Sequence, residues 1–206
     1  MDFGPQPLTT LAERPTPAEM EAAVRTLILG IGENPDREGL LQTPARVVRA
    51  YNEWFAGYNL DPTAVLARSF EDTEGYDDTV VLRDIPLVST CEHHMAAITG
   101  VVHIAYRPAG RVVGVSKLAR LVDVFGRRLQ IQERMTRQLA LTLEGALEPK
   151  GVGVIVAARH ACMTTRGVNH PNALMVTRCW RGAFKTDPAL RLEAFGAEYG
   201  GSTGVA

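Results

Sequence analysis

The amino-acid sequence predicts an α+β fold in which an antiparallel sheet packs against a pair of helices. Extended segments occur in hairpin-like pairs before and after one long helical region. Two helical segments precede every strand signal, and strands and helices do not alternate along the chain. This order is typical of an α+β protein, because parallel sheets are built from strands that alternate with helices.

The 206-residue chain divides into four segments by composition and periodicity. Residues 1–16 are rich in proline and lack apolar periodicity, which predicts a flexible lead-in. Residues 17–76 predict an N-terminal helical region, because two Thr-Pro helix-start signals are each followed by apolar residues at helical spacing. Residues 77–195 contain the strand signals and are expected to form the main domain with its sheet. Residues 196–206 are rich in glycine and predict a flexible tail.

The strand signals define the expected sheet. Extended chain over residues 79–88 leads directly into Cys91, and residues 100–107 predict a strand that turns at 108–110 into a short returning strand at 111–115. The later expected elements are two helices within 116–147, the first capped by Ser116, strands at 152–159 and 173–184, and a short helix that starts at 187–188. Strands thus flank the helical pair on both sides.

Composition and charge limit the functional classes. A hydrophobic content of 46% with 22% charged residues is ordinary for a globular protein. The formal net charge of −1 gives no overall attraction to nucleic acid or to a membrane, so we expect neither as a partner. The apolar runs are shorter than the roughly 18 residues of a membrane span, and the N-terminus lacks the pattern of a signal peptide. We therefore expect a cytoplasmic protein whose three cysteines serve metal or thiol chemistry rather than disulfides.

The densest group of metal-binding side chains is the Cys-Glu-His-His run from Cys91 to His94, and a second group follows at His160 and Cys162. Cys91 and His94 are three positions apart, so one turn can bring both side chains to the same ion. His160 and Cys162 are two positions apart at the expected end of a strand and would therefore project to one face. Thiolate and imidazole ligands together favour Zn²⁺.

The pattern leaves open which side chains bind the ion. The thiol and imidazole candidates for three or four places are Cys91, His93, His94, His160 and Cys162. An open site with three protein ligands and one water is typical of catalysis, and the remaining groups would then be candidates for proton transfer. The alternative is a structural zinc that joins two strand ends. Structural sites more often use Cys-x-x-Cys units and four protein ligands, which favours the catalytic interpretation.

Several cationic side chains lie close to these groups in the sequence or at helix starts. Ser116 and Lys117 begin an expected helix, where free N–H groups favour anions, and Arg120 shares a helical face with Lys117. Arg166 follows the second metal group, and Arg46 follows an earlier helix start. Several cations beside a metal centre indicate a substrate with phosphates. For each one alone, a solvated surface role is the alternative.

Gln132 and Glu133 stand together at an expected helix junction. An amide beside a carboxylate can bind the amide-and-amine edge of a base such as guanine, although a solvated helical face explains the pair equally well. The sequence contains neither a G-x-x-x-x-G-K-[ST] loop nor a G-x-G-x-x-G loop, so the common nucleotide-binding loops lack support.

Four motifs in register resemble the GTP cyclohydrolase I family. They are residues 91–94, 114–120, 127–134 and 160–167, and their order and spacing match the family over about residues 20 to 190. The resemblance implies the tunnelling fold, in which small α+β subunits assemble into a toroidal homodecamer whose sheets join into barrels. It also implies that the sites lie between subunits.

The resemblance implies roles for individual residues. Cys91, His94 and Cys162 would hold Zn²⁺ and leave one place for water, while His160 and His93 would transfer protons. The residues implied in substrate binding are Gln132 and Glu133 at the guanine ring, and Ser116, Lys117, Arg120, Arg166 and Arg46 at the triphosphate.

The implied activity is zinc-dependent hydrolysis of GTP. Water opens the purine imidazole ring at C8, formate is released, and 7,8-dihydroneopterin triphosphate forms as the first product of tetrahydrofolate and pterin biosynthesis. One rival is a nucleobase deaminase, but the chain lacks the Pro-Cys-x-x-Cys motif of that class. A second rival is a catalytically silent oligomer of the same fold, which would not need His93, His160, Lys117 and Arg166 together.

Overall fold

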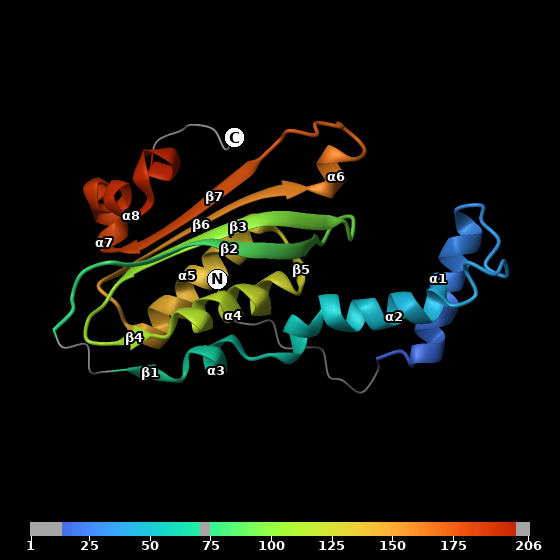
Figure 1. Cartoon of the computed structure of the whole chain (residues 1–206), viewed down its shortest axis with the longest axis horizontal. Coiled ribbons are helices and arrows are strands. Elements are labelled where there is room, and N and C mark those ends of the chain that lie inside the picture. The colour runs from blue at the N-terminus through green and yellow to red at the C-terminus, as the bar shows by residue number, and fades with distance from the viewer. Residues whose placement is uncertain (1–13, 71–74, 201–206) are drawn as a thin grey trace.

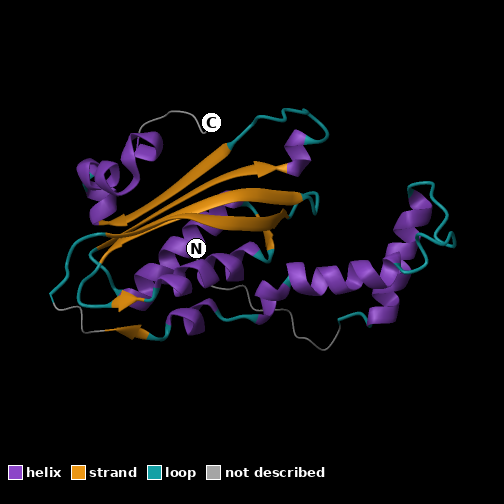
Figure 2. Cartoon of the chain, in the orientation of Figure 1, coloured by secondary structure: helices purple, strands orange, loops and turns teal. Residues whose placement is uncertain are grey.

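The computed structural model describes residues 14–70 and 75–200 of the chain. Figures 1 and 2 show one curled sheet with helices on both faces and a helical arm that projects away from the sheet. Residues 1–13 of the expected lead-in and residues 201–206 of the expected tail lie outside the described residues, whereas residues 196–200 of the expected tail belong to the last helix. The prediction of a mixed α+β fold is confirmed.

The main sheet has five strands in the order β5-β2-β3-β6-β7. The strands are β2 (Val80–Cys91), β3 (Ala97–Arg107), β5 (Leu129–Gln130), β6 (Gly151–His160) and β7 (Met175–Gly182). The four long strands pair antiparallel, as expected, whereas the short β5 pairs in parallel with the end of β2. The chain therefore returns to the end of β2 before it enters the helix that follows β5.

Two hydrophobic clusters cover opposite faces of this sheet. On one face lie α4 (Val115–Gly126) and α5 (Gln132–Leu147). Leucines at helical spacing on these two helices are buried in the core: Leu118, Leu121, Leu139, Leu143 and Leu147. On the other face lie α7 (Ala183–Thr186) and α8 (Pro188–Gly200). There, Phe184 and Phe195 pack against Ile155 and Ala105. Alternation along β3 and β6 thus supplies both clusters.

Two local predictions are wrong. The short strand β4 (Val112–Val113) does not return along β3 but pairs antiparallel with β1 (Ser69–Phe70) to form a separate two-stranded sheet. Ser116 does not cap α4, because the extended backbone of Gly114 occupies the N-cap position and its carbonyl accepts the N–H of Lys117. Ser116 therefore lies inside the first turn of α4.

The helical arm consists of α1 (Pro17–Gly30) and α2 (Thr43–Trp54), joined to the body through η2 (Ala56–Asn59) and α3 (Pro62–Leu66). Thr16 caps α1 as expected: its hydroxyl accepts the N–H of Glu19, whose carboxylate accepts the N–H of Thr16. None of the helices in the described part of the chain combines the length and apolarity that a membrane span needs.

Arg128 joins this arm to the body. Its Nε donates to the carbonyls of Gly57 and Val124 at 3.0 Å, and its Nη2 donates to the carbonyl of Leu60 at 3.1 Å. The guanidinium also lies over the rings of Tyr58 and Phe125, with 5.2 Å to the Phe125 centroid. Burial lowers the pKa of Arg128, and the carbonyls around it compensate for the lost water.

We expect Arg128→Ala to lower the free energy of unfolding by about 2–4 kcal/mol, because three carbonyls lose a charged donor. The control is Arg127→Ala, which removes an exposed neighbour with one long bond of 3.5 Å to the carbonyl of Glu53. Chemical denaturation followed by circular dichroism measures both. Equal losses in the two variants would contradict this role of Arg128.

Candidate metal centre and active site

The site lies at one end of the main sheet, where β2 and β6 both end. β2 ends at Cys91, and a tight turn leads into β3, with Met95 at a positive φ of 51°. β6 ends at His160, opposite Ile98 near the start of β3. Because β3 is antiparallel to both neighbours, the ends of β2 and β6 flank its beginning.

The two metal groups meet in a different way from the sequence prediction. Cys162 does not continue a strand beside His160 but lies in the short helix α6 (Ala161–Thr164). The ends of β2 and β6 are separated by β3, a spacing of about 9–10 Å between the outer strands. α6 turns the chain back toward the end of β2 and brings Cys162 to Cys91 across that spacing.

The donor atoms of Cys91, His94 and Cys162 lie within 4.8 Å of one another. The Sγ atoms of the two cysteines are 3.8 Å apart, and Cys91 Sγ is 4.0 Å from His94 Nδ1. A tetrahedral Zn²⁺ with Zn–S bonds of about 2.3 Å would place two thiolates about 3.8 Å apart. This group could therefore hold a metal ion, and its donor set and spacing fit zinc.

Burial and the nearby Cys91 sulfur raise the pKa of the Cys162 thiol. Two thiolates this close repel each other, which is why ionisation is unfavourable without a cation. A metal ion between the sulfurs reverses this effect, because coordination deprotonates a thiol. The arrangement of the two thiols is thus suited to a bound cation.

His160 is held by the side chain of Gln132, which is fully buried. The Gln132 amide nitrogen lies 3.0 Å from the carbonyls of Val156 and Met175 and 3.1 Å from the hydroxyl of Thr177. These acceptors fix the orientation of the amide, so its oxygen is the atom that lies 2.8 Å from His160 Nε2.

An amide oxygen can only accept a hydrogen bond, so His160 Nε2 must donate, and the neutral ring keeps its lone pair on Nδ1. Burial lowers the pKa of His160, while the nearby Glu133 carboxylate opposes this shift. The neutral, proton-accepting form is therefore favoured relative to a histidine in water. Since the Gln132 amide is fully engaged inside the subunit, its main chain is the part that remains for contact with a ligand.

Three other predicted residues lie beside the metal group. His93 is exposed, and its Nε2 is 3.9 Å from a carboxylate oxygen of Glu92. Arg166 is exposed, and its Nη1 lies 3.4 Å from His94 Nε2. Glu133 is exposed at the first turn of α5, close enough to His160 to affect its pKa.

The other predicted anion-binding residues do not join this cluster within the subunit. Ser116, Lys117 and Arg120 lie in the first turns of α4, whose last turn leads to β5 beside Cys91. At a rise of 1.5 Å per residue, Lys117 lies about 14 Å and Arg120 about 9 Å along this helix from Gly126 at its end. Arg46 is exposed on α2 in the projecting arm. One subunit thus brings the metal group, the histidines, Glu133 and Arg166 together, but not the α4 cations or Arg46.

The sequence prediction missed Arg134, which follows Gln132 and Glu133 on α5 and forms an ion pair with Glu92. The sequence held a signal for this contact: Glu92 lies between the candidate metal ligands, and a partly buried carboxylate needs a cationic partner. It also missed Thr177, whose hydroxyl accepts from the Gln132 amide and contacts Thr136. That contact depends on the pairing of β6 with β7, which sequence spacing does not reveal.

The fold and the site define an α+β protein with a candidate Cys₂His metal centre at the end of its sheet. Residues 20–197 match the family model for GTP cyclohydrolase I. The chain is 54% identical over 178 residues to GTP cyclohydrolase 1 of Maricaulis maris (strain MCS10), which covers 86% of this chain and 87% of the relative. It is 52% identical to GTP cyclohydrolase 1 of Hyphomonas neptunium (strain ATCC 15444), with 86% of each chain covered. The chain therefore belongs to the GTP cyclohydrolase I family, which is a family of enzymes.

Among solved structures, the chain is similar to the apo form of the archaeosine synthase QueF-Like. The TM-score is 0.43 at 19% identity, and the match covers 50% of this chain and 93% of the other.

We expect Cys162→Ser to weaken zinc binding by more than about 100-fold, because a direct thiolate ligand is lost rather than an outer partner. Cys179→Ser is the matched control, since Cys179 is a partly buried cysteine of β7 whose pKa is also raised by burial. Competition with a chromogenic chelator measures the affinity. Equal affinity in Cys162→Ser and the wild type would exclude this ligand set.

Proposed function

We propose that the protein hydrolyses GTP with a bound Zn²⁺, opens the imidazole ring at C8, releases formate and forms 7,8-dihydroneopterin triphosphate. The observation that carries this proposal is the convergence of Cys91, His94 and Cys162 beside His160, in a chain of this family. The product places the reaction at the start of tetrahydrofolate or pterin biosynthesis. We propose a cytoplasmic location for it.

Cys91, His94 and Cys162 would hold the zinc. When bound, Zn²⁺ supplies the Lewis acidity that lets water act as a nucleophile near neutral pH. The 3.8 Å spacing of the two sulfurs supports this assignment. Three protein ligands leave a place for water, which is the arrangement of catalytic rather than structural zinc sites.

His160 would transfer protons at the purine ring. Its Nε2–H is committed to Gln132, so the proton would be taken up and delivered at Nδ1. The hydrogen bond to Gln132 persists in both protonation states, because Nε2 donates in the neutral ring and in the cation. His93 would assist around the ribose, where its exposure leaves the ring accessible to substrate.

The carboxylate of Glu133 would accept the amide and amine N–H groups of guanine. Gln132 would contribute to the same ring through its main chain at the start of α5, since its side chain holds His160. Ser116, Lys117, Arg120, Arg166 and Arg46 would bind the triphosphate. Arg166 already lies beside the metal ligand His94, which supports a phosphate position next to the metal.

The separation of α4 from the metal end supports sites that are shared between subunits. Within one subunit, Lys117 lies about 14 Å and Arg120 about 9 Å along α4 from the end of that helix near β5. A neighbouring subunit could supply its α4 to this site, as the family resemblance implies. We therefore propose a homo-oligomer of the tunnelling fold, a toroidal decamer with joined barrels, in which the catalytic domain spans residues 77–195.

Zinc-loaded wild-type protein is expected to release formate from GTP and to yield a pterin that fluoresces after oxidation. His160→Ala should retain zinc and lower kcat by about 100-fold or more, because it removes the group that transfers protons. Ammonia release without formate would support a deaminase instead. Absence of both products from metal-loaded protein would contradict the proposed activity.

Gln132→Leu should lower kcat by about 10- to 100-fold at unchanged zinc content, because His160 loses the acceptor that fixes its ring. Glu144→Gln is the control: it also removes a side-chain contact between α5 and β7, the ion pair with Arg181, but Glu144 does not contact Gln132 or His160. Steady-state formate release measures both. A wild-type kcat in Gln132→Leu would show that the ring needs no such support.

A further inference from the structure

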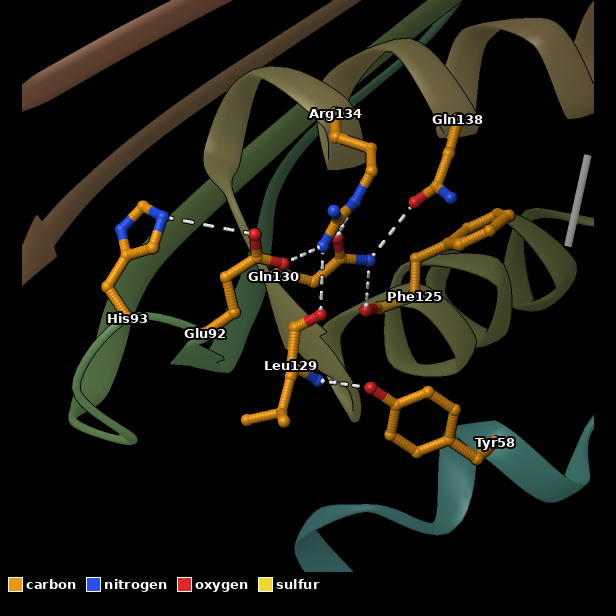
Figure 3. A network of polar contacts seen from close by, with 8 residues as sticks. All are labelled: Tyr58, Glu92, His93, Phe125, Leu129, Gln130, Arg134 and Gln138. Atoms are coloured by element: carbon orange, nitrogen blue, oxygen red, sulfur yellow. Dashed lines mark hydrogen bonds and ion pairs between the residues drawn. The ribbon is translucent and has the colours of Figure 1, made fainter. Parts of the chain in front are cut away.

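Glu92 is the one member of the Cys91–His94 run to which the proposed function gives no role. Its side chain is 30% exposed and lies against Arg134 of α5, with which it forms an ion pair through its Oε2 atom. Figure 3 shows the guanidinium at the centre of a network that reaches from the metal-binding turn to two helices and β5.

Arg134 has several partners besides Glu92. Its Nη2 also donates to the carbonyl of Leu129 at 3.1 Å, and its Nε donates to Gln130 Oε1 at 3.2 Å. Gln130 is 1% exposed, and its amide nitrogen donates to the carbonyl of Phe125 at 3.0 Å and to Gln138 Oε1 at 3.1 Å. The guanidinium is therefore fixed by β5, and β5 in turn is fixed by the end of α4.

The metal-binding turn has few other attachments to the helical layer. Its own hydrogen bonds are local: Cys91 N–H to the Ala96 carbonyl, and Met95 N–H to the Cys91 carbonyl, both at 2.8 Å. Glu92 supplies contacts out of the turn through its N–H, 3.1 Å from the Gln130 carbonyl, and through its carboxylate. The main-chain contact is with Gln130 and the side-chain contact is with Arg134, and these two residues are hydrogen-bonded to each other.

We infer that Arg134 is a positioning residue that holds the metal-binding turn in register with the start of α5 through Glu92. Glu92 follows the ligand Cys91 and precedes His93, and its second oxygen faces His93 at 3.9 Å. Arg134 follows Glu133 on the first turn of α5. The ion pair therefore sets the distance between the metal ligands and the residues proposed to bind guanine. This inference rests on the proposed function, because only a reaction at C8 makes that distance matter.

A positioning role predicts a pattern that loss of stability alone does not produce. In Arg134→Gln and Glu92→Gln the turn should keep its ligands and its zinc, while the metal moves relative to the purine. We expect kcat to fall about 10- to 100-fold in each variant, with KM for GTP within about threefold of the wild type. The double variant should fall no further than either single variant, because both changes break the same contact.

The chain offers a matched control in the Arg181–Glu144 pair. These residues join β7 to α5 with 2.8 Å between Nε and Oε2, and their side chains are 39% and 34% exposed, against 31% and 30% for Arg134 and Glu92. Glu144→Gln removes an ion pair of the same type from the same helix, away from the metal-binding turn. Its kcat should remain that of the wild type.

Hydrogen–deuterium exchange gives a readout that is independent of activity. Amides of residues 91–96 in zinc-loaded protein should exchange at least about fivefold faster in Arg134→Gln than in the wild type, and at the wild-type rate in Glu144→Gln. Unchanged exchange in Arg134→Gln, or a raised KM with normal kcat, would overturn the inference. If the wild type releases no formate, the proposed function fails, while the exchange rates still decide whether Arg134 holds the turn.

Discussion

The pairing of β3 with two antiparallel neighbours is the constraint on which the site depends. Because β2 and β6 both run opposite to β3, their last residues meet at the same end of the sheet. One of these ends supplies Cys91 and the turn with His94, and the other supplies His160 and then Cys162 on α6. Residues about 70 positions apart in the sequence thus come together without a long loop.

Helix α5 supports both halves of this site from one turn. Gln132 and Arg134 are two positions apart, so their side chains point to nearly opposite sides of the helix, about 200° apart. Gln132 reaches β6 and orients His160, whereas Arg134 reaches the metal-binding turn and holds Glu92. Glu133 lies between them in the sequence and is exposed. The same turn that is proposed to bind guanine therefore also contacts His160, the proposed acid–base residue, and the turn that holds the proposed metal ligands.

The sequence predicts the parts of this site that depend on local spacing. Cys91 and His94 meet because a turn brings together residues three positions apart, and the motifs indicated Cys162 as their partner. It does not predict contacts that depend on strand pairing or on the direction of a side chain. From the sequence, Gln132 is predicted to be an accessible amide at the start of a helix. In the structure, its side chain is buried where β6 pairs with β7, and its amide nitrogen faces three acceptors. The pairing of β4 with β1 was missed for the same reason, since short strands carry little sequence signal.

The central claim is an open metal centre with two thiolates and one imidazole, and zinc K-edge X-ray absorption of the metal-loaded protein tests it most directly. The account predicts two sulfur neighbours at about 2.3 Å and two nitrogen or oxygen neighbours at about 2.0–2.1 Å, with scattering from a single imidazole ring. Scattering from two imidazole rings would mean that His160 or His93 closes the site. Fewer than two sulfur neighbours would mean that Cys91 and Cys162 do not bind the metal together.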